Sequence, residues 1–190
     1  MRSSLSEALE QAESCLNLFR NDPSILTSMD QITEAISAAF LRGNKLMTCG
    51  NGGSMADAMH IAEEFSGRFK NDRRPYPAMA FSDPAHLSCA ANDYGYEHVF
   101  ERMVEAFGKS GDVLLALSTS GNSANVVLAA QKARERGVTV VGALGVSEGK
   151  LGSLCDLKIN VPSTRSDRIQ EIHMLAFHAI IEAVEIDLGH

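Results

Sequence analysis

The first forty residues carry apolar side chains at spacings close to those of an α-helix. The segment Asn21-Asp22-Pro23 interrupts this spacing, because proline disfavours a helix interior, and Gly43 then marks a helix stop. The pattern therefore predicts a helical segment over residues 1–43. Its apolar positions are Leu5, Leu9, Leu16, Ile32, Ile36 and Phe40.

From residue 45 onward, short apolar runs alternate with helical patterns. Continuous apolar strands between helices are typical of a parallel sheet that is covered on both faces. The sequence thus predicts a three-layer α/β fold with additional helices at the N-terminus. The predicted strands span residues 45–49, 78–81, 112–117, 138–144 and 157–161. The predicted helices span residues 54–65, 126–136 and 167–188.

Length and charge narrow the possible functions. A chain of 190 residues without a linker or repeat fits one domain, 1–190. The net charge of −7 argues against a nucleic-acid-binding protein, which needs a basic patch. The chain has neither an apolar run of roughly 18 residues, as a membrane helix requires, nor the charge order of a signal peptide. We therefore expect a cytoplasmic protein without membrane contact.

The four cysteines are scattered at Cys15, Cys49, Cys89 and Cys155 and form no CxxC pair. This spacing argues against a structural zinc site of the finger type. Free cysteine is among the most buried residue types, so we expect all four in or near the core.

Open α/β sheets bind ligands at the carboxyl ends of their strands, and one loop there is rich in hydroxyl groups. It spans residues 118–123 and opens a helix, whose N-terminal N–H groups favour a phosphate. No lysine follows as in a Walker loop, so the loop suits a monophosphate. The alternative is a plain N-cap turn, where serine and threonine are also favoured. The hydroxyl residues are Ser118, Thr119, Ser120 and Ser123.

A second loop, Gly50-Asn51-Gly52-Gly53-Ser54, connects the first predicted strand to a helix. Such a loop can hold a phosphate or shape the floor of a pocket, but glycine-rich turns of this kind are common. By itself the loop leaves both interpretations open.

His60 and Glu64 lie four residues apart on the helix that follows this loop, and therefore on one helix face. Asp57 lies on nearly the same face. A histidine and a carboxylate at this spacing can bind a divalent metal or act as an acid–base pair. An exposed, solvated pair is the alternative, although apolar neighbours argue against full exposure.

The last predicted helix carries Gln170, His173 and His178. At about 100° per residue, Gln170 and His178 lie about 80° apart, whereas His173 and His178 lie about 140° apart. Periodicity leaves two pairings open, Gln170 with His178 or Gln170 with His173. For either histidine, a buried structural role is the alternative to a site.

Several motifs together resemble those of the phosphoheptose isomerase family, within the sugar isomerase (SIS) domain superfamily. The resemblance spans essentially the whole chain and implies a flavodoxin-like five-stranded parallel sheet between helices. The motifs lie at residues 49–54, 57–60, 62–64, 91–95, 117–123 and 168–173.

The resemblance also implies roles for individual residues. Glu64 and His178 would be the acid–base residues, and one zinc ion per subunit would be bound by His60, Glu64, Gln170 and His178. The family forms homotetramers with active sites at subunit interfaces, so residues 1–43 would serve partly in assembly. The residues implied in binding a sugar phosphate are Asn51, Gly52, Gly53, Ser54, Asn92, Asp93, Ser118, Thr119, Ser120, Ser123 and Gln170.

The implied reaction converts D-sedoheptulose 7-phosphate to D-glycero-D-manno-heptose 7-phosphate through an enediol or enediolate, the first step towards ADP-heptose for the lipopolysaccharide core. One positioned base and one acid suffice for it. The alternative is a non-catalytic SIS-domain protein that associates with a replication initiator. Such a protein has other residues at the positions equivalent to His60 and Glu64. The presence of both residues in this chain favours the enzyme.

Overall fold

The computed structural model describes residues 2–190, with side chains from Ser4 onward, so Met1 of the predicted N-terminal segment lies outside the described residues. Within them, one sheet of five parallel strands has the order β2-β1-β3-β4-β5. The strands are β1 Leu46–Cys49, β2 Ala78–Ala80, β3 Val113–Ser118, β4 Thr139–Leu144 and β5 Leu157–Asn160. Each overlaps a strand expected from the sequence.

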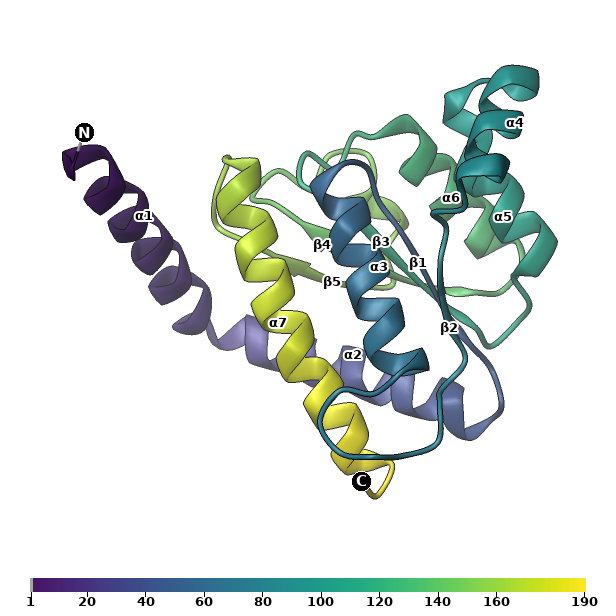
Figure 1. Cartoon of the computed structure of the whole chain (residues 1–190), viewed down its shortest axis with the longest axis horizontal. Helices are drawn as coiled ribbons and strands as arrows, with labels where there is room; N and C mark the ends of the chain where they lie inside the picture. The colour runs from purple at the N-terminus through teal and green to yellow at the C-terminus, as the bar shows by residue number, and fades with distance from the viewer. Residues whose placement is uncertain (1) are drawn as a thin grey trace.

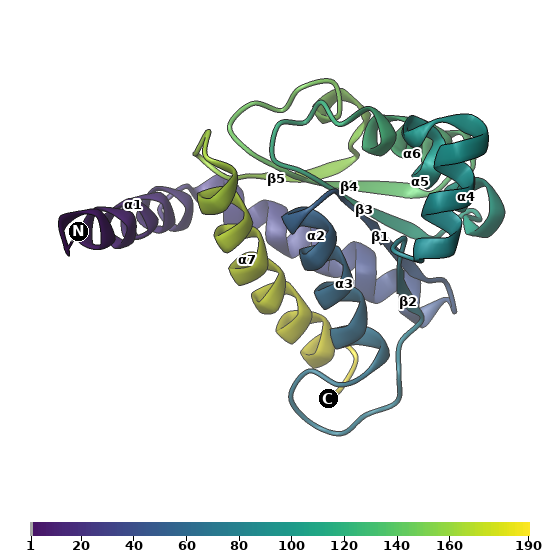
Figure 2. The same cartoon turned by 45° about the horizontal axis from the view of Figure 1, so that its top comes forward.

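Helices cover both faces of the sheet, as the views in Figure 1 and Figure 2 show. Successive side chains of β3 point to opposite faces, since Leu115 belongs to the hydrophobic cluster on one face of the sheet and Leu114 to the cluster on the other. The predicted three-layer α/β fold is therefore confirmed. One layer holds α2 Pro23–Leu41, α3 Gly53–Ser66 and α7 Ser166–Asp187. The other holds α4 Pro84–Tyr94, α5 Val99–Phe107 and α6 Ala124–Glu135, with the short 3-10 helices Tyr96–His98 and Gly152–Leu154.

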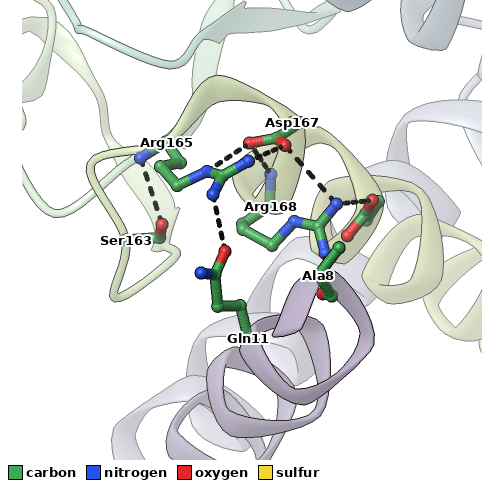
Figure 3. A network of polar contacts seen from close by, with 7 residues as sticks. Ala8, Gln11, Ser163, Arg165, Asp167 and Arg168 are labelled. Carbon is green, nitrogen blue, oxygen red and sulfur yellow. Dashed lines mark hydrogen bonds and ion pairs between the residues drawn. The ribbon is translucent and has the colours of Figure 1, made fainter. Parts of the chain in front are cut away.

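Helix α1, Arg2–Arg20, projects away from the sheet and joins α2 at a turn (Figure 1). The turn follows from the sequence, because Asp22 accepts the Ser24 N–H at 2.9 Å and so caps α2. Two arginines at the start of α7 fasten α1. Arg165 donates to the Gln11 side chain and Arg168 to the Ala8 carbonyl, each at 2.6 Å (Figure 3).

The region between β2 and β3 was not predicted from the sequence. Here α4 buries a single residue, Ala90, so its apolar pattern is weak. The same helix carries Cys89, which is exposed, so the expectation that all four cysteines lie in or near the core was wrong. Cys15 and Cys49 are buried and Cys155 is partly buried.

The strand order places a crevice beside β1. The order reverses between β1 and β3, and the connections from these two strands leave on opposite faces of the sheet. Such a switch point opens a ligand crevice at the carboxyl ends of the two strands. The loops that follow β1 and β3 are the glycine-rich loop and the hydroxyl-rich loop.

Candidate active site

The hydroxyl-rich loop begins at the end of β3 and leads into α6. The Ser118 and Ser123 hydroxyls lie 3.1 Å apart, and Ser120 Oγ accepts the Asn122 N–H at 3.2 Å. Ser123 occupies the N-cap position of α6, yet its side chain makes no capping hydrogen bond. The N-cap alternative therefore does not account for this serine, and the loop retains hydroxyl and N–H groups suited to an anion.

The loop after β4 supports this turn. Gly121 has φ +66°, and a Cβ at that position would lie 2.0 Å from the Glu148 carbonyl oxygen. The Gly121 carbonyl accepts the Leu151 N–H at 2.9 Å, and the Asn122 side chain accepts the Lys150 N–H at 3.2 Å. Only glycine therefore fits at position 121. The loop after β4 holds the turn in this conformation.

The start of α7 contacts the same turn. Thr119 Oγ1 lies 3.2 Å from Ser166 Oγ. Next to Ser166, Asp167 accepts both Arg165 and the Arg168 N–H, and the Arg165 hydrogen bond contributes most to lowering the pKa of Asp167 to about 2. Figure 3 shows Arg165, Asp167 and Arg168 at the beginning of α7, where it meets α1.

The glycine-rich loop is joined to α6 through Asn51. The side-chain amides of Asn51 and Asn125 exchange two hydrogen bonds of 2.8 Å, and the Tyr96 hydroxyl donates to Asn51 Oδ1 at 3.2 Å. Gly52, at the N-cap of α3, has φ +55°. The sequence predicted a role for Asn51 but not for its partners Asn125 and Tyr96. The signal for Asn125 was an asparagine in the first helical turn after the serine loop.

His60, Glu64 and His178 come together where α3 and α7 lie side by side. His60 Nε2 lies 3.1 Å from Glu64 Oε1, and the two imidazole rings are 5.1 Å apart, edge to face. One ligand atom from each of the three residues lies within 4.8 Å of the others. His60 is half exposed (45%), whereas only 14% of Glu64 is exposed, so the pair is not a fully solvated one.

The donor set of this group fits a divalent metal. Two imidazoles and a carboxylate are ligands that zinc takes in catalytic sites, where three protein ligands leave one position open. The structure thus contains a possible metal-binding group at His60, Glu64 and His178.

Gln170, the fourth predicted ligand, lies away from these three residues. Its amide lies 3.4 Å from Ser54 Oγ and covers Gly53, at the beginning of α3. His178 is eight residues further along α7, which corresponds to about 12 Å of helix. The structure therefore brings Gln170 to the glycine-rich loop, and the other three residues to one another.

His173 has the buried structural position. It is fully buried, its Nε2 lies 3.1 Å from the Leu144 carbonyl oxygen, and burial lowers its pKa to about 4. The ring is therefore neutral near pH 7 and donates to that carbonyl. Of the two histidines that periodicity left open, His178 lies beside His60.

Three further polar residues that the sequence singled out are Asp57, Asn92 and Asp93. Burial raises the pKa of Asp57 on α3 to about 6, and the neighbouring His60 opposes the rise. Asn92 and Asp93 lie exposed at the end of α4, where the Asn92 amide donates to Asp93 at 2.8 Å. The hydrogen bond of Tyr96 to Asn51 links the segment after α4 to the crevice.

Comparison with known proteins decides the family. Residues 15–145 match the SIS domain family. The phosphoheptose isomerase of Fusobacterium nucleatum is 49% identical over 82% of this chain and 80% of its own. This chain belongs to the phosphoheptose isomerase family. Another phosphoheptose isomerase, from Edwardsiella ictaluri, is 46% identical over 100% of this chain and 96% of its own.

A solved phosphoheptose isomerase shares the fold along the whole chain. The enzyme from Neisseria gonorrhoeae superposes with a TM-score of 0.91 at 34% identity, over 97% of this chain and 98% of its own. The resemblance inferred from the motifs is therefore confirmed, together with the SIS-domain fold.

Proposed function

We propose that the protein is an aldose–ketose isomerase that converts D-sedoheptulose 7-phosphate to D-glycero-D-manno-heptose 7-phosphate, at the entry to ADP-heptose and lipopolysaccharide core synthesis. The observation that carries the proposal is the meeting of Glu64 with His60 and His178 in a chain of this family. A non-catalytic binding protein would have no need of this group.

The reaction moves a carbonyl from C2 to C1. A base removes a proton from C1, and negative charge develops on oxygen in an enediolate. An acid returns a proton at C2, and the proton of the O1 hydroxyl passes to O2. We assign the base to Glu64 and the acid to His178, which lie in one group of polar side chains. An imidazole can donate or accept a proton, so we propose His178 for the transfer at C2.

We propose that one zinc ion is bound by His60, Glu64 and His178, and that Gln170, the fourth predicted ligand, joins them only by leaving its position beside Ser54. Such an ion would polarise the sugar oxygens and stabilise the charge of the enediolate. Because the Gln170 amide lies beside Ser54, we also propose Gln170 as a sugar contact.

The substrate phosphate is assigned to the turn that opens α6, with its hydroxyls and N–H groups. The sugar then extends towards the glycine-rich loop on the other side of the switch point. Asn92 and Asp93 are kept as proposed sugar contacts. The phosphate contacts are Ser118, Thr119, Ser120 and Ser123, and the other sugar contacts are Asn51, Gly52, Gly53, Ser54 and Gln170.

We also propose a single domain over 1–190, a cytoplasmic location and a homotetramer. Residues 1–43 are the proposed assembly segment, and its α1 helix exposes Leu5 and Leu9 at 69% and 73%. The charge of −7 is consistent with a partner other than nucleic acid. No helix in the described part of the chain is long and apolar enough to cross a membrane.

The test is direct. The purified protein is incubated with sedoheptulose 7-phosphate, and aldose formation is followed by proton NMR with a chelator and with zinc restored. We expect an aldose heptose phosphate in the zinc arm and loss of turnover in the chelator arm. Absence of turnover under every metal condition would reject the isomerase and favour the binding protein.

A further inference from the structure

A buried ion pair joins the ends of the two helices that carry His60, Glu64 and His178. Arg73, in the loop that follows α3, donates Nε–H to Glu185 Oε1 on α7 at 2.6 Å. The two side chains are 0% and 7% exposed. Buried charges persist where they are paired and hydrogen-bonded, so this pair fixes the loop against the last turns of α7.

The same guanidinium group caps α3. Its Nη2 donates to the carbonyl oxygen of Glu64 at 2.7 Å, and its Nη1 donates to that of Phe65 at 2.8 Å. The last carbonyls of a helix lack partners within the helix and carry a partial negative charge, which a cation stabilises. Arg73 therefore holds the backbone of the residue that we assign as the base.

The loop of Arg73 also packs against the third member of the group. The ring of Phe69 stacks on His178 with centroids 5.7 Å apart and an interplanar angle of 24°. Further along, the Arg73 guanidinium lies 4.9 Å from the ring centroid of Tyr76, which itself stacks on Phe40. The arginine is thus held by a cation–π contact with Tyr76 as well as by its hydrogen bonds.

We propose that Arg73 is a positioning residue for the metal-binding group of His60, Glu64 and His178. It fixes the last turn of α3, which carries Glu64, against α7, which carries His178, and so sets the distance between these two ligands. Its described contacts are with carbonyls, Glu185 and Tyr76, so it acts through the helix ends. The inference rests on the proposed function only in treating this group as the site of a divalent metal.

The experiment compares two substitutions in the same loop. Arg73→Lys keeps the positive charge, but an ammonium group cannot reproduce the planar fork that reaches Glu185 and both carbonyls. Lys70→Gln is the matched control. It removes an exposed ion pair between Lys70 and Glu182 of α7 and the contact of the ammonium group with the Phe69 ring, 5.7 Å from its centroid, but no hydrogen bond to α3. The control therefore tests whether loss of a charge beside Phe69 is sufficient to change the site.

The first readout is affinity for Co²⁺, measured by visible absorption in competition with a chelator, at a temperature where circular dichroism shows each protein folded. We expect Arg73→Lys to bind cobalt roughly 10- to 100-fold more weakly. Its kcat should fall in parallel, whereas KM for the sugar phosphate should change less. Lys70→Gln should match the native protein in all three quantities.

Unchanged cobalt affinity in folded Arg73→Lys, an equal loss in Lys70→Gln, or no cobalt binding by the native protein would overturn the inference. Should Arg73→Lys not fold, Glu185→Gln takes its place, because it retains an acceptor for Nε. Weaker cobalt binding by that folded variant supports the inference, and native affinity overturns it. A native protein that binds cobalt without turning over sedoheptulose 7-phosphate rejects the proposed function alone, since the comparison of affinities stands.

Discussion

The side-chain amides of Asn51 and Asn125 exchange two hydrogen bonds of 2.8 Å each across the crevice loops. This reciprocal pair ties the glycine-rich loop after β1 to the first turn of α6. Asn125 is also buried, with 3% of the residue exposed, and its Oδ1 accepts the Val126 N–H at 3.0 Å. Asn125, a buried residue, therefore fixes the two loops of the crevice relative to each other.

Replacing Asn125 should weaken both the fold and the site. In Asn125→Ala the Asn51 amide and the Val126 N–H lose their partner, and an unsatisfied buried group costs about 1 to 3 kcal/mol. We expect that loss in the free energy of unfolding in urea, and a higher KM for the sugar phosphate. Asn71→Ala, at an exposed position in the loop after α3, is the control. Native stability and KM in Asn125→Ala would contradict the role of the pair.

Ser123 separates anion binding from helix capping. Aspartate is a good N-cap residue and its charge favours a helix N-terminus, so Ser123→Asp should melt no lower than the native protein. The same charge repels phosphate. Inorganic phosphate should therefore raise the melting temperature of the native protein, by mass action, but not that of the variant. Equal stabilisation by phosphate in both proteins would show that the anion does not bind at this turn.

Glu64→Gln tests the assigned base. The amide keeps the size of the side chain but cannot accept the proton from C1. Since general acid–base catalysis contributes roughly 10²- to 10⁴-fold, kcat should fall by that factor. Phosphate binding and the oligomeric state, followed by melting and by size-exclusion chromatography, should not change. A rate close to that of the native protein would show that another group is the base.

His173 predicts a loss of stability in mild acid. Its pKa is about 4 in the folded chain and 6.5 as the ordinary value, so the unfolded chain binds the proton more readily. The free energy of unfolding should therefore fall as the pH is lowered from 6.5 towards 4, by on the order of 3 kcal/mol, and level off below that. Above pH 6.5 both states are neutral and this stabilisation is complete.

The measurement compares the native protein with His173→Gln, which keeps a donor for the Leu144 carbonyl. The comparison is needed because Asp57, with its pKa raised to about 6 from 3.8, contributes the opposite slope over much of the same range. Urea unfolding in the presence of a chelator gives the free energies. The advantage of the native protein should shrink towards pH 4, and a constant difference would contradict the burial of a neutral His173.

The sheet could be predicted because its strands are continuous apolar runs. Such strands are buried on both faces, as in a parallel sheet between two layers of helices. The loops at 50–54 and 118–123 could be located for the same reason, since they follow such strands. The partners of those loops could not. The pairing of Asn51 with Asn125 depends on which strands become neighbours, and periodicity alone could not choose between His173 and His178, because both choices depended on what packs against α7.

Helices between β2 and β3 escaped prediction for a different reason. In this region α4 buries only Ala90, so its apolar pattern is weak. The nine residues of α5 do bury Val99, Phe100, Met103 and Val104 at helical spacing, a pattern from which this short helix could have been predicted. Helices of this length gain most of their stability from tertiary packing rather than from their own sequence. The exposed position of Cys89 follows from the same packing.

The strand order has a consequence for the order of folding. β3 pairs with β4 and β4 with β5 over short stretches of chain, as in the registers of Val113 with Thr139 and Val141 with Leu157. The pairing of β1 with β3 joins Leu46 to Val113, and closing so long a loop carries a larger entropic cost. The C-terminal strands should therefore assemble before β1 enters the sheet. The contacts that hold the phosphate turn come from the loop after β4 and the start of α7, whereas the glycine-rich loop can join Asn125 only once β1 has docked. A newly made chain should therefore acquire its phosphate subsite first and its sugar subsite at the end of folding.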